Sequence, residues 1–221
     1  LVRNGDRFGW IQGEDGQWHL TLYIYSGRVK DTESLQLRTA LREIAKVHTG
    51  EFRMTCNQNL IIANISAEQK PVIEQLVEQY QLDIGESRPA LRLNAMACVA
   101  LPTCALAMAE SERYLPEFLG KLEQIMSDVG LPEKLINIRI TGCPNGCARP
   151  YLGEIALTGK AIGRYNLNLG ADFSGQRLNR LYLENVDETT ILNTLKPMIE
   201  QFAAEREQDE HFGDFLIRVG I

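Results

Sequence analysis

The sequence has few cysteines, few histidines and no long apolar run. Five cysteines in 221 residues are too few for a secreted fold held together by disulfides. No stretch approaches the ~18 apolar residues of a membrane span, and the first residues lack the apolar region of a signal peptide. These absences predict a cytoplasmic protein with reduced thiols and no membrane segment. The three histidines show no metal-ligand spacing and are interpreted as ordinary surface or strand residues: His19, His48 and His211.

Other absences restrict the chemistry. The net charge of -6 gives no indication of nucleic-acid binding, since nucleic-acid partners favour a basic surface. The sequence offers no Ser/His/Asp constellation. Residues 159–164 contain two glycines and a lysine, but their order does not match a phosphate-binding loop.

The most informative residues present are four cysteines in two short pairs. Cys98 and Cys104 stand in ACVALPTC, and Cys143 and Cys147 stand in TGCPNGCARP. Four thiolates together can hold a metal centre, and soft sulfur ligands favour an iron–sulfur cluster, zinc or copper(I). The first spacing is longer than the two to four residues typical of structural zinc pairs. The second pair lies in a Gly/Pro/Asn turn whose N–H groups can stabilise charge on sulfur. On the cysteines alone, structural zinc or plain buried thiols remain open.

The periodicity of apolar residues predicts an α+β protein of two domains, residues 1–88 and 89–221. In the first domain the expected order is β-α-β-β-α, close to a ferredoxin-like split unit. Alternation predicts strands, and apolar residues three and four apart predict helices. The expected elements are a strand at 17–25, a helix from Asp31 or Thr32 to about 48, strands at 51–56 and 59–65, and a helix from Ser66 to about 80.

The second domain is predicted to be an α/β unit that carries the cysteines. Residues 81–95 resemble a linker, and Pro197 is expected to kink or split the last long helix. The expected helices are 106–113, 116–129 and 187–206, and the expected strands are 135–140, 153–158, 164–169 and 180–183.

The segments around the cysteines resemble a known family. MACVALPTCALAMAE (96–110) and TGCPNGCARP (141–150) are similar to the two cluster motifs of the sulfite/nitrite reductase haemoproteins. The resemblance continues through residues 51–63, 159–170 and 212–220. It is closest to the haemoprotein (beta) subunits of bacterial NADPH-dependent sulfite reductases. Ala148 stands where that family more often has glycine, and alanine is small enough not to displace a ligand.

The resemblance implies a set of site residues. Cys98, Cys104, Cys143 and Cys147 would bind one 4Fe–4S cluster, and the Cys147 thiolate would also bridge to the iron of a sirohaem. At that iron the family reduces sulfite to sulfide with six electrons. Cys147 is therefore the expected catalytic residue.

Three further residues carry alternative interpretations. By the resemblance, Arg53 lies near the cofactor, where it could pair with a sirohaem carboxylate; the alternative is a surface arginine beside a polar turn. Asn145 could hydrogen-bond near the cluster or sirohaem, or it could supply the left-handed conformation of the turn. Cys56 lies away from both pairs and is expected to be a buried free thiol.

The resemblance also implies partners. A flavoprotein (alpha) subunit would pass electrons from NADPH, in the sulfur assimilation that leads to cysteine. The family's subunit is longer than this chain, so the chain is expected to be a C-terminal half that is inactive alone, with much of the sulfite pocket in the N-terminal half. The alternatives are the corresponding half of a nitrite reductase and a non-catalytic zinc or thiol module.

Overall fold

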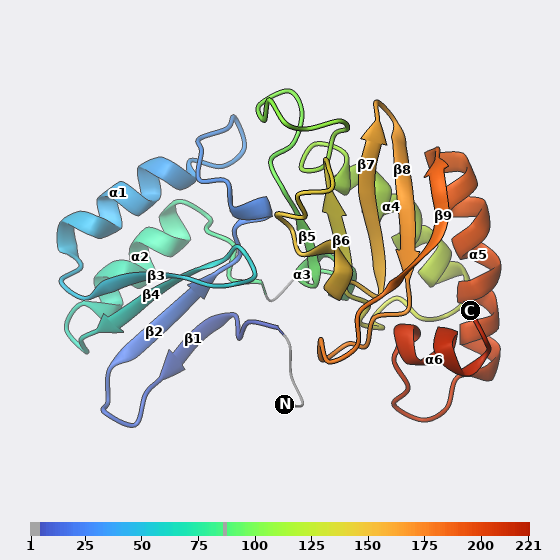
Figure 1. Cartoon of the computed structure of the whole chain (residues 1–221). Coiled ribbons are helices and arrows are strands. Elements are labelled where there is room, and N and C mark those ends of the chain that lie inside the picture. Colours follow the sequence, from blue (N-terminus) through green and yellow to red (C-terminus); the bar gives the residue numbers. More distant parts are fainter. Residues whose placement is uncertain (1–4, 86–87) are drawn as a thin grey trace. The chain divides into compact units, whose positions relative to one another are not determined.

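The computed structural model describes residues 5–85 and 88–221. They form two compact units, Gly5–Arg88 and Pro89–Ile221, each with its own sheet and helices (Figure 1). No helix in the described residues is long and apolar enough to cross a membrane.

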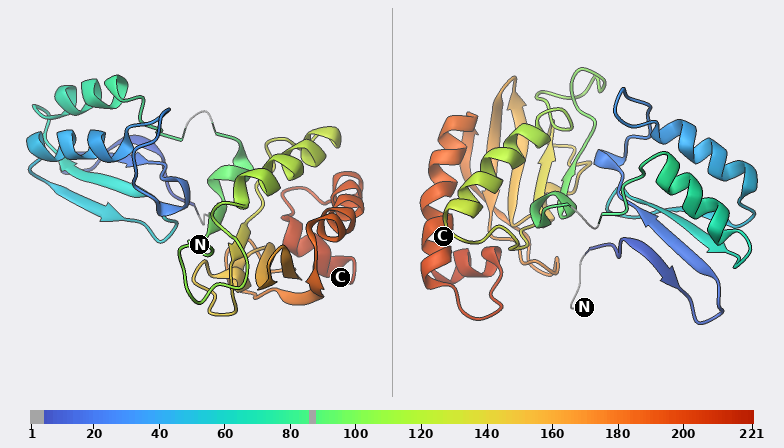
Figure 2. Two further views of the ribbon diagram at one scale, coloured as in Figure 1. Left: turned by 90° about the horizontal axis from the view of Figure 1, so that it is seen from above. Right: turned by 180° about the vertical axis from the view of Figure 1, so that it is seen from behind.

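The first unit is a four-stranded antiparallel sheet with two helices on one face (Figure 2). The strand order is β1-β2-β4-β3, so β4 lies between β2 and β3 and is antiparallel to both. This is the ferredoxin-like split arrangement, with β1 added at the edge beside β2. The elements are β1 (Gly9–Gln12), β2 (Trp18–Leu22), the 3-10 turn η1 (Tyr25–Gly27), α1 (Leu37–Val47), β3 (Glu51–Met54), β4 (Leu60–Ile65) and α2 (Lys70–Gln79).

The core of the first unit forms between its sheet and its two helices. Helix α1 buries Leu37, Ala40 and Ile44, which recur at three- and four-residue spacing on one side. They share a cluster with Leu20 and Ile62 of the central strands, both without solvent exposure. Burial of each such leucine or isoleucine stabilises the fold by about 1.5–3 kcal/mol.

Helix α1 begins later than the sequence predicted. Residues 31–36 form a turn in which Leu35 N donates to Thr32 Oγ1 over 3.0 Å. The Asp31 carboxylate accepts from Thr39 N at 3.0 Å, from outside the helix. Asp31 thus lies outside α1 but still accepts a hydrogen bond from its first turn, whereas Thr32 closes the turn in front of the helix. Strand β1 was not predicted, since it is a four-residue, partly exposed edge strand.

The second unit is a five-stranded mixed sheet in the order β5-β6-β7-β8-β9. The first three strands are parallel, and β8 and β9 continue the sheet in antiparallel pairs. Helices α4 and α5 cover one face, as seen from behind in Figure 2. The elements are α3 (Ala90–Leu93), β5 (Ala95–Ala97), α4 (Leu115–Asp128), β6 (Ile138–Thr141), the 3-10 turn η2 (Pro150–Leu152), β7 (Ile155–Ala161), β8 (Arg164–Leu169), β9 (Arg180–Val186), α5 (Glu188–Glu205) and α6 (Phe212–Arg218).

Several expectations for the second unit were wrong. The predicted linker 81–95 contains α3 and the start of β5, and α6 was not predicted. Residues 106–113 are turns and not a helix, because the N–H groups of Met108 and Ala109 donate to Gly142 O instead of to a carbonyl one turn back. Pro197 does not split α5, which runs as one helix from Glu188 to Glu205 with the exposed proline inside it.

Candidate metal centre

Strand topology brings the two cysteine motifs to one edge of a sheet. Strands β5 and β6 are parallel neighbours, with Ala97 opposite Ile140. Cys98 follows β5 directly, and Cys143 follows β6 two residues after its end. Because the carboxyl ends of parallel neighbours lie at the same edge, both motifs start side by side (Figure 1). The N–H of Cys98 donates to Ile140 O at 3.2 Å, which extends the pairing into the first motif.

The segment that follows Cys98 is hydrogen-bonded to the end of β6 and to the first residues of the second motif. Met108 N and Ala109 N both donate to Gly142 O, at 2.8 and 3.0 Å. The Ser111 hydroxyl, fully buried, donates to Ile140 O at 2.7 Å. These bonds join residues more than 25 positions apart, and they hold the loop that contains Cys104 against the end of β6.

Two glycines permit this close approach. A Cβ at Gly142 would lie 2.5 Å from the Ala100 side chain and 2.8 Å from Ala109 O. A Cβ at Gly159, in β7, would clash with the carbonyl oxygen of Gly142. Both contacts involve backbone or short side chains that cannot move away, so a larger residue at either position would push the two motifs apart.

Hydrogen-bond donors converge on the sulfur of Cys98. Gly142 N lies 3.2 Å from Cys98 Sγ, and the Thr141 hydroxyl lies 3.5 Å from it. Hydrogen-bond donors to sulfur are typical of ligand sulfurs in metal centres.

The second motif is a tight turn. Gly146 has φ +69° and Arg149 has φ +53°, and Arg149 N donates to Gly146 O at 2.8 Å. Asn145 is exposed and does not have a positive φ, so the interpretation that it supplies the left-handed residue is wrong. Ala148 is fully buried, also without a positive φ. Alanine therefore fits the position where the family more often has glycine.

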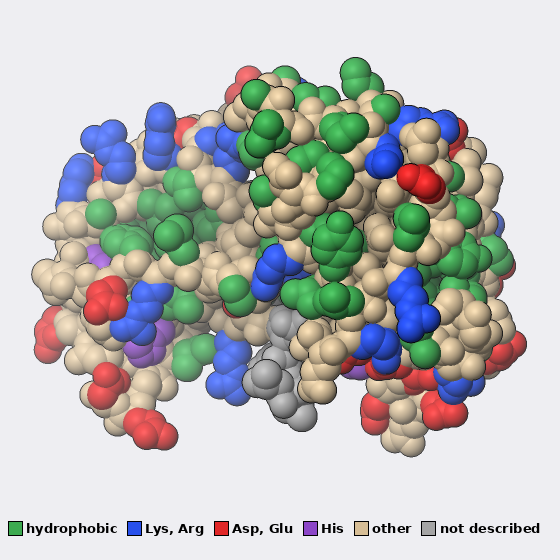
Figure 3. Space-filling view, in the orientation of Figure 1, with side chains coloured by type: hydrophobic (Ala, Val, Ile, Leu, Met, Phe, Trp, Pro, Cys, Tyr) green, Lys and Arg blue, Asp and Glu red, His purple; other side chains and the backbone are tan. Residues whose placement is uncertain are grey.

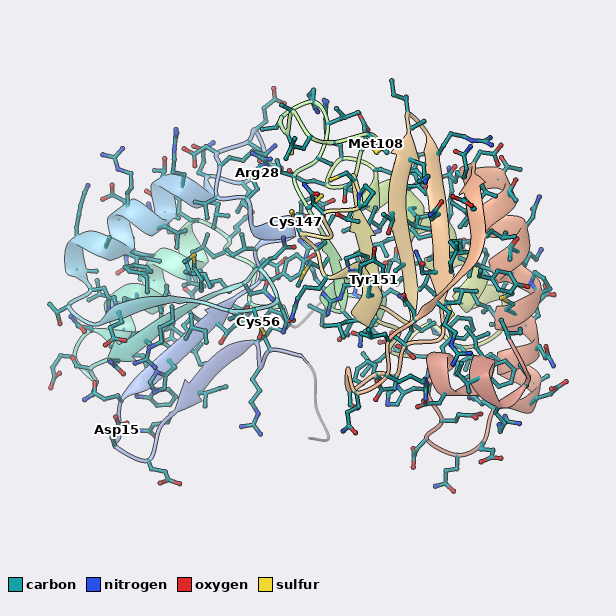
Figure 4. The ribbon with its side chains drawn as sticks, in the orientation of Figure 1. Asp15, Arg28, Cys56, Met108, Cys147 and Tyr151 are labelled. Carbon is teal, nitrogen blue, oxygen red and sulfur yellow. The ribbon has the colours of Figure 1, made fainter. Side chains whose placement is uncertain are left out.

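The cysteines differ in exposure. Cys143 is buried, Cys98 and Cys104 are partly exposed, and Cys147 is exposed in the loop that follows β6 (Figure 4). Within the described residues no disulfide joins any of the five cysteines. Cys56 is exposed, which contradicts the expected buried thiol. It lies beyond the end of β3, in a turn closed by Thr55 N and Asn59 O at 2.9 Å.

Arg53, the other residue with an expected cofactor role, lies in the first unit on β3. Its Nε donates to Glu51 Oε2 at 2.8 Å, and its side chain is half exposed. The neighbouring turn is organised by Asp6, whose carboxylate accepts from Thr55 Oγ1 and Asn59 Nδ2, each at 2.7 Å. The sequence did not single out Asp6, because its partners lie about 50 positions away.

The four cysteines of the second unit offer the thiolate ligands of a 4Fe–4S cluster. Among the described residues no three His, Cys, Asp or Glu side chains are grouped as they would be around a single metal ion. A 4Fe–4S cluster binds each cysteine through a different iron, so its ligand sulfurs stand farther apart. Two cysteine pairs on adjacent anchored loops, with N–H and O–H donors to sulfur, fit that larger group.

The outer surface of the cysteine loop is apolar. Leu106 and Met108 are exposed, and so is Ile162 in the turn between β7 and β8. In Figure 3 hydrophobic side chains gather over this end of the unit, and Figure 4 shows Met108 beside the end of β7. Exposed apolar patches of this kind often mark binding surfaces.

Comparisons with known proteins match both units. The model described as "Nitrite/Sulfite reductase ferredoxin-like half domain" matches residues 11–80. The model described as "Nitrite and sulphite reductase 4Fe-4S domain" matches residues 90–221.

Curated relatives are similar over almost the whole chain. A sulfite reductase (NADPH) hemoprotein beta-component from Oceanobacillus iheyensis is 60% identical over 98% of the chain. Proteins of the same name from Staphylococcus carnosus and Afipia carboxidovorans are 57% and 58% identical over 99% and 100% of it. In each case the chain spans 38% of the relative's length.

Two solved structures share the fold. The Mycobacterium tuberculosis NirA protein aligns with a TM-score of 0.74 at 23% identity, over 99% of this chain and 41% of its own. A dissimilatory sulfite reductase I aligns with a TM-score of 0.61 at 13% identity, over 92% of this chain and 67% of its own. At these identities the likeness concerns the fold alone. The two family models, which together cover both units, show that the chain belongs to the nitrite and sulfite reductase family.

Proposed function

We propose that the chain is the C-terminal part of a sulfite reductase haemoprotein, and that Cys98, Cys104, Cys143 and Cys147 bind its 4Fe–4S cluster. The proposal rests mainly on one observation: both cysteine pairs leave adjacent parallel strands at the same edge of one sheet. The sulfite reductase names of relatives at 57–60% identity support sulfite, over nitrite, as the substrate.

Within this site the four cysteines have different tasks. Cys143 is buried, Cys98 and Cys104 are partly exposed and Cys147 is exposed, so we assign the bridge to sirohaem to Cys147, the most accessible of the four. With cluster and sirohaem bound, the site would pass to sulfite the six electrons that an external donor delivers, and sulfite would be reduced to sulfide. The chain's own contribution would be to position the four sulfurs and to donate hydrogen bonds to the sulfur of Cys98.

Two polar residues, one in each unit, are proposed to contact bound cofactors. Asn145 is exposed within the turn that carries Cys147, two positions before it, where its amide can contact a bound cofactor. Arg53 would exchange its exposed partner Glu51 for a carboxylate of sirohaem, since a guanidinium pairs well with carboxylates. We also propose that residues 1–88 and 89–221 are the two domains of the chain.

The remaining parts of the proposal concern partners. The relatives' names include NADPH and a beta-component, which supports a flavoprotein alpha-component as the electron donor and sulfide for cysteine biosynthesis as the product. The rest of the haemoprotein would complete the sulfite pocket, so this chain alone is expected to be inactive. Reduced thiols and a need for NADPH suit the cytoplasm.

The ligand assignment is tested by replacing each cysteine with serine. Anaerobically purified variants at positions 98, 104, 143 and 147 should lose most of their iron and acid-labile sulfide. Cys56→Ser is the matched control and should retain both, because Cys56 lies in the other unit. Full iron in two of the four ligand variants would refute the assignment.

A further inference from the structure

Thr141 is a buried hydroxyl between the two cysteine motifs. It is the last residue of β6 and has no solvent exposure. Its Oγ1 lies 3.5 Å from Cys98 Sγ and 3.4 Å from Cys143 O. A threonine has one hydroxyl proton, so Thr141 can donate to only one of these two acceptors at a time.

The charge on Cys98 decides to which of the two acceptors the Thr141 hydroxyl donates its hydrogen bond. When Cys98 is a thiolate bound to iron, its sulfur carries negative charge, and a hydrogen bond to a charged acceptor is stronger than one to a neutral carbonyl. The hydroxyl then points to Cys98. Gly142 N, at 3.2 Å from the same sulfur, adds a second donor.

We propose that Thr141 is a positioning residue that raises the reduction potential of the cluster through its hydrogen bond to Cys98. Reduction adds an electron to the cluster and so increases the negative charge on its sulfurs. A donor to a ligand sulfur therefore stabilises the reduced state more than the oxidised state, and hydrogen bonds to sulfur are among the determinants of cluster potentials. The proposal rests on the proposed function, because it needs a cluster bound at Cys98.

A purely structural role for Thr141 predicts a different result. If the hydroxyl served only to tie the Cys143 carbonyl, its removal would loosen the second motif and lower iron content, but a cluster that remained bound would keep its potential. Cluster content and potential therefore have to be measured together.

The test uses the full-length haemoprotein loaded with its cofactors. Thr141→Val removes the hydroxyl at nearly constant size, and Thr141→Ser restores it. We expect Thr141→Val to retain iron and to shift the cluster's reduction equilibrium about ten-fold toward the oxidised form, which is a midpoint about 59 mV more negative for one electron. Thr141→Ser should stay near the wild type. An EPR-monitored redox titration gives the midpoint, and iron analysis gives the occupancy.

The chain supplies a matched control in the neighbouring strand. Thr158 lies opposite Thr141 in the β6–β7 pair, is also buried, and its hydroxyl has no hydrogen-bond partner in the described part of the chain. Thr158→Val should therefore leave the midpoint unchanged. An equal shift in Thr158→Val and Thr141→Val would show a general effect of lost polarity and would overturn the proposal.

A third variant and the iron content of all variants separate the remaining explanations. Thr141→Ala removes the hydroxyl without placing a methyl group beside the sulfur, and it should show the same negative shift. A wild-type midpoint in either iron-loaded variant would overturn the proposal. Loss of iron from both variants, with full iron in Thr141→Ser, would show a structural role alone and would also overturn it. Absence of a cluster from the wild-type protein would instead contradict the proposed function.

Discussion

Glu154 is a fully buried carboxylate directly before β7. Its two oxygens accept from Asn137 N at 2.7 Å and Gly213 N at 2.8 Å, so it joins the segment before β6 to the first turn of α6. Burial is the largest influence and raises the pKa of Glu154 to about 7, against the opposing effect of the two N–H donors. The second unit therefore contains one acid that ionises near neutral pH.

The raised pKa predicts how stability changes with pH. Because the folded pKa lies above the unfolded value of 4.5, the folded state binds more protons between these values, and stability falls as pH rises through them. The full difference corresponds to about 3 kcal/mol. Relative to Glu154→Gln, which cannot ionise, the wild type should lose most of that amount between pH 4.5 and pH 8.

The measurement is the free energy of unfolding from urea denaturation, followed by circular dichroism, at pH 4.5 and pH 8. Glu133→Gln, at an exposed position nearby in the sequence, is the control and should follow the wild type at both. Parallel pH profiles of the wild type and Glu154→Gln would mean that Glu154 does not titrate with folding.

Lys70 is held between two aromatic rings. Its Nζ lies 4.8 Å from the ring centroids of both Trp10 and Trp18 and 3.0 Å from Glu74 Oε1. Cation–π contacts are worth about 0.5–1 kcal/mol each at exposed sites and more when they are desolvated. Lys70→Gln should therefore destabilise the first unit by about 1–2 kcal/mol.

Urea denaturation followed by tryptophan fluorescence measures this loss directly, since the two rings report the local unfolding. Lys46→Gln on α1 is the control. That lysine is mostly exposed and forms an ion pair with Glu43 on the same helix. Equal stability of the two variants would show that the ring contacts contribute nothing.

At the scale of elements, close packing between β6, β7 and the cysteine loop controls the site. Gly159→Ala would place a Cβ against the carbonyl oxygen of Gly142, a backbone atom that also anchors the cysteine loop. The variant should bind less iron than the wild type although all four cysteines are intact. Iron and acid-labile sulfide per chain measure the effect.

A second glycine provides the comparison. A Cβ at Gly120, inside α4, would meet nothing within 4 Å. Gly120→Ala should therefore keep full iron and gain about 0.4–1 kcal/mol of stability, as alanine favours the helix. Full iron in Gly159→Ala as well would show that the two loops can separate without loss of the cluster.

A comparison of the predicted and observed helices and strands shows which features the sequence can predict. Strands with clear alternation, such as β8, were predicted at their observed bounds, and the fold class was correct. The helix expected at 106–113 failed because its N–H groups find Gly142 O, which no local pattern encodes. The cysteines stand out by residue type, whereas Thr141 and Gly159 acquire their roles only from neighbouring strands. Local sequence thus predicts the candidate ligands but not the residues that hold them in place.

At the scale of the whole molecule, tryptophan fluorescence reports on one of the two units alone. Both tryptophans, Trp10 and Trp18, lie in the first unit, and the cysteine motifs lie in the second. Each unit has its own core, so each is expected to unfold as its own cooperative step. A bound cluster should stabilise only the unit that binds it.

Anaerobic urea denaturation of cluster-loaded and cluster-free protein tests this expectation. The fluorescence midpoint should be the same in both, while the circular dichroism curve should contain a second transition that moves to higher urea when the cluster is present. A single transition with one midpoint for both signals would show that the two units unfold together.

The order in which the strands of the second unit are synthesised determines when the proposed site can form. The ribosome releases the first cysteine pair roughly 40 residues before the second, which at about 5–20 residues per second is a delay of several seconds. During that interval Cys98 and Cys104 have no partner pair, because β6 has not yet been made. The proposed cluster can be inserted only after β6 has paired with β5. The proposed site therefore cannot form until β6 is available, and Cys98 and Cys104 wait for the second cysteine pair until then.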